Sequence, residues 1–283
     1  MGKKEFLAQE YSVAKGGKNI KEGTKTGRTG TILVGTFFCF SLVISISLIA
    51  FTIVFFFSRV EGSSMMATLN PDYTTVHSAN TDSVLVNRRS SPRRGDIIVV
   101  RYYRPTGNHN DGRGNFDFFI KRLIAMNGDT VYFNRIPLDE PTAGGQHYRF
   151  EIQVNGIAID ESYLDPYWGQ NVTYQRVWNY LYVNRYASRF AYFIRPVTYP
   201  NGIIRNEIHV PRGYMFYMGD NRGGSGTRED LELKSYDSSF FGPMPMSTLV
   251  GVVVDIVPNT RSLPAYFWQQ FVHFITFRWV SQR

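Results

Sequence analysis

The sequence predicts a mostly β protein, with an antiparallel β-sheet domain and an inserted β-rich cap, preceded by one transmembrane helix. Three observations lead to this prediction. An uncharged apolar run covers residues 31–57. From residue 82 onward, short segments rich in β-branched and aromatic residues alternate with turns. The 283 residues include 22 Phe and 18 Tyr, enough for the core of one large domain or two modest ones.

The apolar run, TILVGTFFCFSLVISISLIAFTIVFFF, is long enough to cross a bilayer, which takes about 20 residues. It is too long for the core of a cleavable signal peptide, which has about 7–15 residues. Residues 1–30 form a basic tail with seven Lys or Arg and three Glu, and 7 − 3 gives +4 of the net charge of +8. The positive-inside rule then places the N-terminus in the cytoplasm and the rest of the chain outside.

The part after the span is predicted to consist of strands joined by turns. Residues 134–206 are rich in Tyr, Asn and Arg and show weak periodicity, so they are predicted to form the inserted cap. The main β domain then comprises 58–133 and 207–262. The predicted strands are DSVLVN (82–87), GDIIVVRYY (95–103), FDFFIKRLIAM (116–126), DTVYFN (129–134), FEIQVNGIAI (150–159), NEIHVP (206–211), YMFYMGD (214–220) and LVGVVVDIV (249–257).

The C-terminal segment, residues 263–283, has a helical pattern instead. On a helix, Phe267, Phe271 and Phe274 share one face, and polar side chains lie opposite. Trp and Arg in this segment suit a helix that lies on the membrane surface. An ordinary C-terminal helix docked on the domain fits the pattern equally well.

Several kinds of chemistry have no support in the sequence. The only cysteine, Cys39, lies in the apolar run, so no disulfide within the chain is possible. The five His are scattered without metal-ligand spacing, so we expect neither a zinc site nor any cofactor. Half of the basic charge is explained by the flank of the span, and a nucleic-acid partner is not expected.

A serine and a lysine stand out as candidates for catalysis. Ser64 lies in SSMMATL, directly after the span, and Lys121 lies among Phe119, Ile120 and Leu123. A serine nucleophile needs a base, and no His has an obvious partner. Burial among apolar neighbours lowers the pKa of an amine, so a neutral lysine could serve. The plain alternative is a small-residue turn and a solvated basic pair at a strand end.

Four segments, taken together and in order, are more specific than either residue alone. They are SSMMATL (63–69), RRGDIIVV (93–100), FFIKRLIAMNGD (118–129) and MGDNRGGSGTREDLELKSYDSSFFGPMP (218–245). This pattern resembles the bacterial type I signal peptidases, which have an SM box after a membrane helix, a GD strand, a KR…GD box and a GDNR…S-x-D-S box. The resemblance covers residues 60–130 and 209–252. VNGIAIDESYL and VPRGYMFYMGDNR are also similar to connecting segments of that family.

The resemblance implies a membrane-bound serine endopeptidase that removes N-terminal signal peptides from exported preproteins. In such an enzyme Ser64 would be the nucleophile and Lys121 the general base of a Ser–Lys dyad. Ser235 would help to orient the lysine, and Asp237 would support the dyad. The backbone N–H of Gly62, with that of Ser64 itself, would stabilise the oxyanion.

The resemblance also implies a specificity and a location. Cleavage is expected after small residues in an Ala-x-Ala pattern, and partners would be preproteins and the lipid bilayer, with no metal and no nucleic acid. A monomer is expected in the bacterial inner membrane, single-pass, with its catalytic domain on the periplasmic side. The substrate pocket would be lined by Val60, Leu69, Val84, Val99 and Ile120.

The chain departs from the family pattern at three places. Ala67 stands where Pro is usual, Ser239 stands where an Arg usually pairs with the aspartate, and residues 224–232 look inserted. We expect Arg122 or Lys234 to pair with Asp237 instead, and an Arg at position 239 to form a partly exposed ion pair. Two other functions remain open: a LexA-like self-cleaving peptidase, and an inactive membrane-anchored β domain that binds envelope material.

Overall fold

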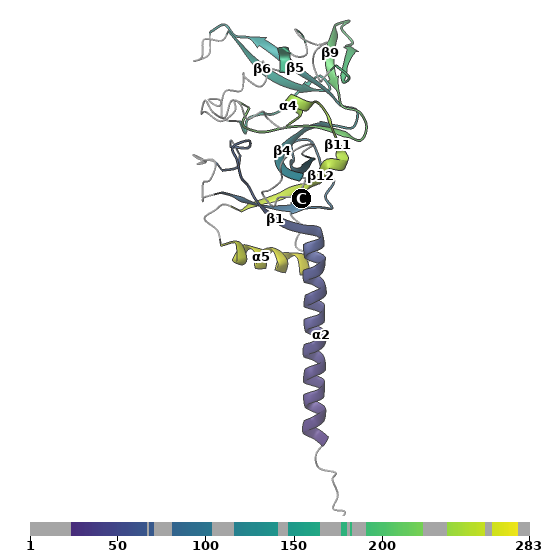
Figure 1. The fold of residues 1–283 in the computed structure, drawn as a ribbon, viewed down its shortest axis with the longest axis vertical. Helices are drawn as coiled ribbons and strands as arrows, with labels where there is room; N and C mark the ends of the chain where they lie inside the picture. The colour runs from purple at the N-terminus through teal and green to yellow at the C-terminus, as the bar shows by residue number, and fades with distance from the viewer. Residues whose placement is uncertain are drawn as a thin grey trace, which may run out of the picture. The chain divides into compact units, whose positions relative to one another are not determined.

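The structure is a computed structural model, and its chain divides into two compact units, one ending at Phe51 and the other beginning at Thr52. The second unit holds both β-sheets (Figure 1). The residues that the structure describes are 24–66, 68–70, 81–103, 116–140, 147–164, 177–179, 182, 191–222, 237–257 and 262–276.

The apolar run forms the helix α2, Thr24–Val54. Its part Gly30–Val54 has a mean hydropathy of 2.6 and is long and apolar enough to cross a membrane. The helix ends earlier than the predicted residue 57, because Phe55–Arg59 form strand β1, which pairs antiparallel with β2, Ser83–Asn87. Consecutive Phe residues suit both a membrane helix and a strand, so apolar character alone could not place this boundary.

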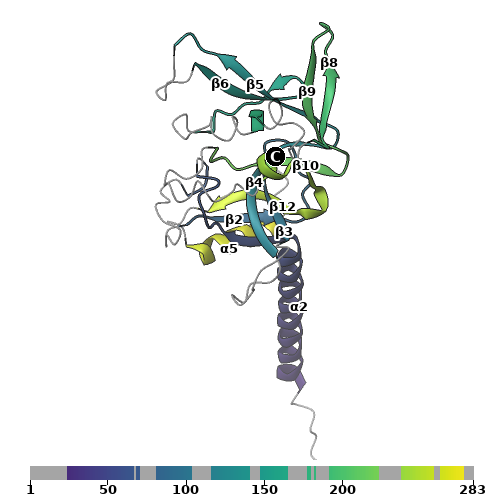
Figure 2. The ribbon, with the colours of Figure 1, turned by 45° about the horizontal axis from the view of Figure 1, so that its top comes forward.

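The first sheet is antiparallel and has seven strands in the order β1-β2-β12-β3-β4-β10-β11. Figure 2 shows β2, β12, β3 and β4 side by side. This sheet confirms the predicted antiparallel fold class, and β1 and β11 are strands that the sequence analysis missed. The remaining bounds are Ile97–Tyr103 for β3, Phe116–Met126 for β4, Tyr214–Met218 for β10, Met244–Pro245 for β11 and Leu249–Val257 for β12.

The second sheet has five antiparallel strands in the order β7-β6-β5-β9-β8. The cap boundaries predicted at 134 and 206 therefore fall inside strands, since the sheet begins at Thr130 and ends at His209. The bounds are Thr130–Pro137 for β5, Tyr148–Val154 for β6, Ile157–Ala158 for β7, Ile194–Thr198 for β8 and Ile204–His209 for β9.

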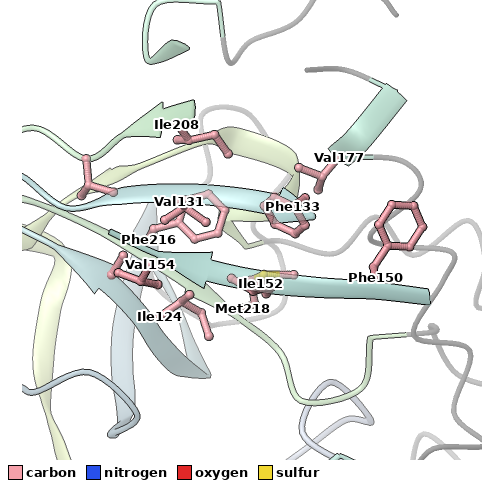
Figure 3. Close-up of a cluster of buried hydrophobic side chains, with 12 residues drawn as sticks. Ile124, Val131, Phe133, Phe150, Ile152, Val154, Val177, Ile208, Phe216 and Met218 are labelled. Carbon is pink, nitrogen blue, oxygen red and sulfur yellow. The ribbon is translucent and has the colours of Figure 1, made fainter. Parts of the chain in front are cut away.

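One hydrophobic core joins the two sheets (Figure 3). Ile124 and Phe216 of the first sheet pack with Val131, Phe133 and Ile152 of the second. The chain passes from β4 to β5 through a tight turn in which Asn127 and Gly128 both have positive φ, of 49° and 99°. The sequence signal NGD therefore marks the point where one strand ends and the next sheet begins.

The C-terminal helix α5, Leu263–Ile275, packs on β1. The ring of Phe57 lies 5.9 Å from that of Tyr266, and the ring of Phe55 lies 6.0 Å from that of Phe274. One face of α5 is docked on the domain, as one predicted alternative requires. The other face presents apolar side chains, with Trp268 56% exposed, as a helix on the membrane surface would. Before α5, residues 237–257 include the short helix α4, Ser238–Phe241, and the 3-10 helix η3, Met246–Thr248.

Candidate active site

Buried side chains and a hydrogen bond hold the loop that carries Ser64 in place. Met65 and Leu69 are each 1% exposed and bury their side chains beneath the loop. Asn70 closes the loop, since its side chain donates to the carbonyl of Val60 at 3.0 Å. Ser64 itself is exposed. A reactive hydroxyl is thus presented to solvent on a segment whose backbone is fixed by its neighbours.

Lys121 reaches this serine from the middle of β4. Its Nζ lies 2.7 Å from the Oγ of Ser64 and 3.1 Å from the carbonyl oxygen of Ile120. Lys121 is 3% exposed, and its Nζ lies 5.6 Å from the centre of the Phe119 ring. The serine and lysine predicted from sequence, far apart in the chain, are therefore within hydrogen-bond distance.

Burial lowers the pKa of Lys121 from 10.5 to about 8. Desolvation is the largest cause, because a charged ammonium loses its hydration in the interior. The nearby carboxylates of Asp237 and Asp220 act in the opposite direction and raise the pKa. The net result is an amine with a substantial neutral fraction near pH 8, which can accept a proton from a hydroxyl.

The guanidinium of Arg122 forms its ion pair with Asp220, whereas the sequence analysis expected Asp237. Arg122 Nη2 lies 2.7 Å from Asp220 Oδ2, and Nε lies 2.9 Å from Oδ1, a two-point contact that suits the planar guanidinium. The hydroxyl of Thr68 donates to the same carboxylate at 2.5 Å. The Asp220 side chain is 0% exposed and that of Arg122 12%, and the pair connects β4 to the loop after β10.

That loop, residues 219–222, packs directly on the backbone of the nucleophile. Asn221 N–H donates to the carbonyl of Ser64 at 3.0 Å, and its side-chain amide donates to the carbonyl of Ser63 at 3.0 Å. A Cβ atom on Gly219 would lie 2.4 Å from the carbonyl oxygen of Ser64. Only glycine fits this close approach.

Asp237 is buried and accepts several hydrogen bonds. Its Oδ2 accepts from Gly219 N–H at 3.1 Å, and its Oδ1 accepts from the backbone N–H and the hydroxyl of Ser239 at 2.9 and 2.5 Å. Ser239 is 0% exposed, so the partly exposed ion pair expected at this position is wrong. An arginine side chain at position 239 would have to enter a packed interior. Ser235, Lys234 and Ala67 lie outside the described residues.

The groups expected to form an oxyanion hole lie at the start of the Ser64 loop. Gly62 has φ of 92°, a conformation that favours glycine. Among the residues that the structure describes, the backbone N–H groups of Gly62 and Ser64 donate no hydrogen bond. Such unsatisfied donors are available to a developing negative charge.

The five residues predicted to line the substrate pocket gather in one apolar cluster next to the Ser64 loop. Val60, Leu69, Val84 and Val99 are each 3% exposed or less, and Ile120 packs against them in a partly buried position. Ile120 therefore stands between the buried cluster and solvent, one residue from Lys121.

Four contributors to this arrangement lie in motifs that the sequence singled out but received no individual role there: Thr68, Gly219, Asp220 and Asn221. Three of them belong to GDNR, a short polar motif that follows the apolar strand β10. The position of this charged turn, directly after a buried strand, indicates that its side chains can meet groups from other strands. Thr68 had no such signal, since its role depends on where Asp220 lies.

Comparison with known proteins adds independent information. Residues 33–257 match the family model described as signal peptidase, peptidase S26. A signal peptidase I from Bacillus caldolyticus is 29% identical over 217 residues, which cover 74% of this chain and 84% of that protein. A signal peptidase I from Aquifex aeolicus is 28% identical over 200 residues, which cover 59% and 72%. A crystal structure of an Enterococcus faecalis signal peptidase I, 20% identical, covers 58% of this chain and 98% of that one with a TM-score of 0.27.

Proposed function

Because this chain belongs to the signal peptidase family, peptidase S26, and is a serine peptidase that removes signal peptides, we propose that Ser64 and Lys121 form its catalytic dyad. The observation that supports the dyad best is the 2.7 Å separation of Lys121 Nζ and Ser64 Oγ at a buried lysine. Membership of this family sets aside both the LexA-like alternative and the non-enzymatic one.

The geometry supports the following steps. Neutral Lys121 takes the proton of the Ser64 hydroxyl while Oγ attacks the carbonyl carbon of the scissile bond. The N–H groups of Ser64 and Gly62 stabilise the oxyanion of the tetrahedral intermediate. The Lys121 ammonium then gives its proton to the leaving amine. Lys121, neutral again, then takes a proton from a water molecule, which attacks the carbonyl carbon of the acyl–enzyme. Lys121 returns the proton to Ser64 Oγ as the acyl group leaves.

The dyad is tested with detergent-solubilised full-length protein and a preprotein. Ser64→Ala and Lys121→Met should abolish cleavage while the protein stays folded. Ser58→Ala is a matched control, because it removes from β1 a hydroxyl that donates to the backbone carbonyl of Arg59. Cleavage that persists in Ser64→Ala would reject the dyad.

We further propose that the apolar cluster beside Ser64 selects small residues at P1 and P3. The cluster is packed and apolar, so it favours a methyl group over a large side chain, which would force its members apart. In a scan of P1 residues, Ala, Gly and Ser should be cleaved and Phe and Leu refused. Equal turnover of Ala and Leu at P1 would remove this assignment, and Ile120→Ala should widen the accepted range.

A further inference from the structure

A turn that follows β7, the edge strand of the second sheet, packs beside the candidate active site. After β7, residues 160–164 form a turn in which Leu164 N–H donates to the carbonyl of Glu161 at 3.0 Å. Leu164 is 6% exposed and anchors the turn in the interior. The turn places the side chains of Glu161 and Tyr163 next to the loop 219–222.

Arg222 connects this turn to the loop from within. It is 1% exposed, and its Nε donates to the carbonyl of Gly219 at 2.6 Å. Its Nη1 lies 2.6 Å from Glu161 Oε1, and its Nη2 donates to the hydroxyl oxygen of Tyr163 at 3.2 Å. A buried guanidinium needs such partners, since removing one leaves an uncompensated charge in the interior.

Tyr163 makes a second contact, with the residue that follows Lys121. The guanidinium carbon of Arg122 lies 3.9 Å from the centre of the Tyr163 ring. Arg122 in turn holds Asp220, which precedes Asn221 and Arg222 in the loop. One aromatic side chain therefore contacts Arg222, which belongs to the loop, and Arg122, which holds Asp220 of the same loop.

We propose that Glu161 and Tyr163 are positioning residues that hold loop 219–222 against the carbonyl of Ser64, so that the second sheet sets the reactivity of the dyad. This rests on the proposed function of Ser64 and Lys121. The loop lies between two sets of contacts: Asn221 and Gly219 touch the nucleophile on one side, and Arg222 is held by the turn on the other. Loosening the turn should let the loop retreat and admit water to Lys121.

The test compares variants of Tyr163 in the full-length enzyme, with kcat and KM measured for one preprotein from pH 6 to 10.5. Tyr163→Leu removes both the ring and the hydroxyl, and should lower kcat by about 10- to 100-fold with KM little changed, because the nucleophile is misplaced. The midpoint of its pH–rate profile should rise above that of the parent, since water reduces the desolvation of Lys121. Tyr163→Phe keeps the ring and should lose less activity.

Tyr199→Leu is the matched control. Like Tyr163, Tyr199 has its ring near a guanidinium, 5.0 Å from the guanidinium carbon of Arg205, and its hydroxyl donates to Glu207, but these partners belong to β9. The Tyr199→Leu substitution should lower thermal stability and leave the midpoint of the pH–rate profile unchanged. A midpoint shift in Tyr163→Leu but not in Tyr199→Leu separates positioning from a general loss of structure.

The outcomes separate the two proposals. If Ser64→Ala is inactive and folded Tyr163→Leu keeps the parent kcat and midpoint, the positioning role is rejected and the dyad stands. If Ser64→Ala cleaves, the dyad itself is rejected. Should Tyr163→Leu fail to fold, Glu161→Gln replaces it: a lower kcat with a shifted midpoint supports the positioning role, and the parent kcat and midpoint overturn it.

Discussion

At the scale of single residues, the burial that makes Lys121 a base also destabilises the folded state. The pKa of Lys121 falls from 10.5 to about 8 on folding, so the unfolded chain binds the proton more tightly. Below pH 8 this lowers the free energy of unfolding by up to about 3 kcal/mol, and the loss is recovered as the pH rises from 8 to 10.5. Function and stability therefore conflict at this side chain.

Lys121→Met should consequently stabilise the protein at neutral pH while abolishing cleavage. Urea unfolding of parent and variant should show the variant more stable at pH 7 by up to about 3 kcal/mol. The difference should shrink as the pH approaches 10.5, because the lysine is then neutral in both states. A difference that stays constant across this range would contradict the depressed pKa.

The same pKa predicts how activity depends on pH. With a pKa of about 8, roughly one Lys121 in ten is neutral at pH 7, against about one in 3,000 at the ordinary lysine pKa of 10.5. The rate should rise with pH through a midpoint near 8. Lys121→Arg should be inactive throughout, since a guanidinium stays charged. A profile governed only by a group near pH 6.5 would indicate a histidine base.

Gly219 is predicted to be irreplaceable for a steric reason. A Cβ there would lie 2.4 Å from the carbonyl oxygen of Ser64, so Gly219→Ala should displace the nucleophile and lower kcat by about 100-fold. Gly251→Ala is the control, because its Cβ would lie 2.7 Å from the carbonyl oxygen of Asn87, in the sheet. Gly251→Ala should lose thermal stability, with kcat per folded molecule retained. Equal effects of both variants on kcat would contradict the prediction.

At the scale of elements, β1 directly follows the apolar helix α2 and contacts α5. Phe55 directly follows Val54, the last residue of α2, and contacts Phe274 of α5. The outer face of α5 presents Trp268, Val272 and Ile275, which are 56%, 47% and 42% exposed. Because α5 packs on β1, which directly follows α2 in the chain, we propose that this face lies on the lipid surface.

Fluorescence of the reconstituted enzyme tests this proposal. In vesicles that contain brominated lipid, Trp268 should be quenched, so Trp268→Phe should remove a quenched component of the emission. Trp178→Phe is the matched control, because Trp178 packs near Tyr182 in the second-sheet region. Quenching that is unchanged in Trp268→Phe would show that α5 is only docked on β1.

At the scale of the whole molecule, the apolar helix and the family membership indicate a membrane-anchored enzyme. We propose that its N-terminus is cytoplasmic, since the basic charge before the helix favours that side. A protease added to right-side-out inner-membrane vesicles should digest the part after residue 60 and spare the N-terminal tail. Protection of that part, with digestion after detergent as the control, would reverse the orientation.

The sequence by itself determined the fold class, the apolar helix, most strands and the identity of Ser64 and Lys121 as candidates. These follow from local signals: the length of an uncharged run, β-branched and aromatic segments between turns, and short motifs in a specific order. The missed β1 shows the limit of such signals, because its Phe residues continue the apolar run without a break and only pairing with β2 makes them a strand.

Only the tertiary structure decided which charged and polar groups meet. Arg122 faces Asp220 rather than Asp237, and Ser239 is buried against Asp237, because the loop after β10 folds back on the Ser64 loop. Glu161 and Tyr163 contact Arg222 from the turn that follows β7. Such contacts join residues far apart in the chain, and their partners depend on how two sheets pack on a shared core, which no local pattern of residues encodes.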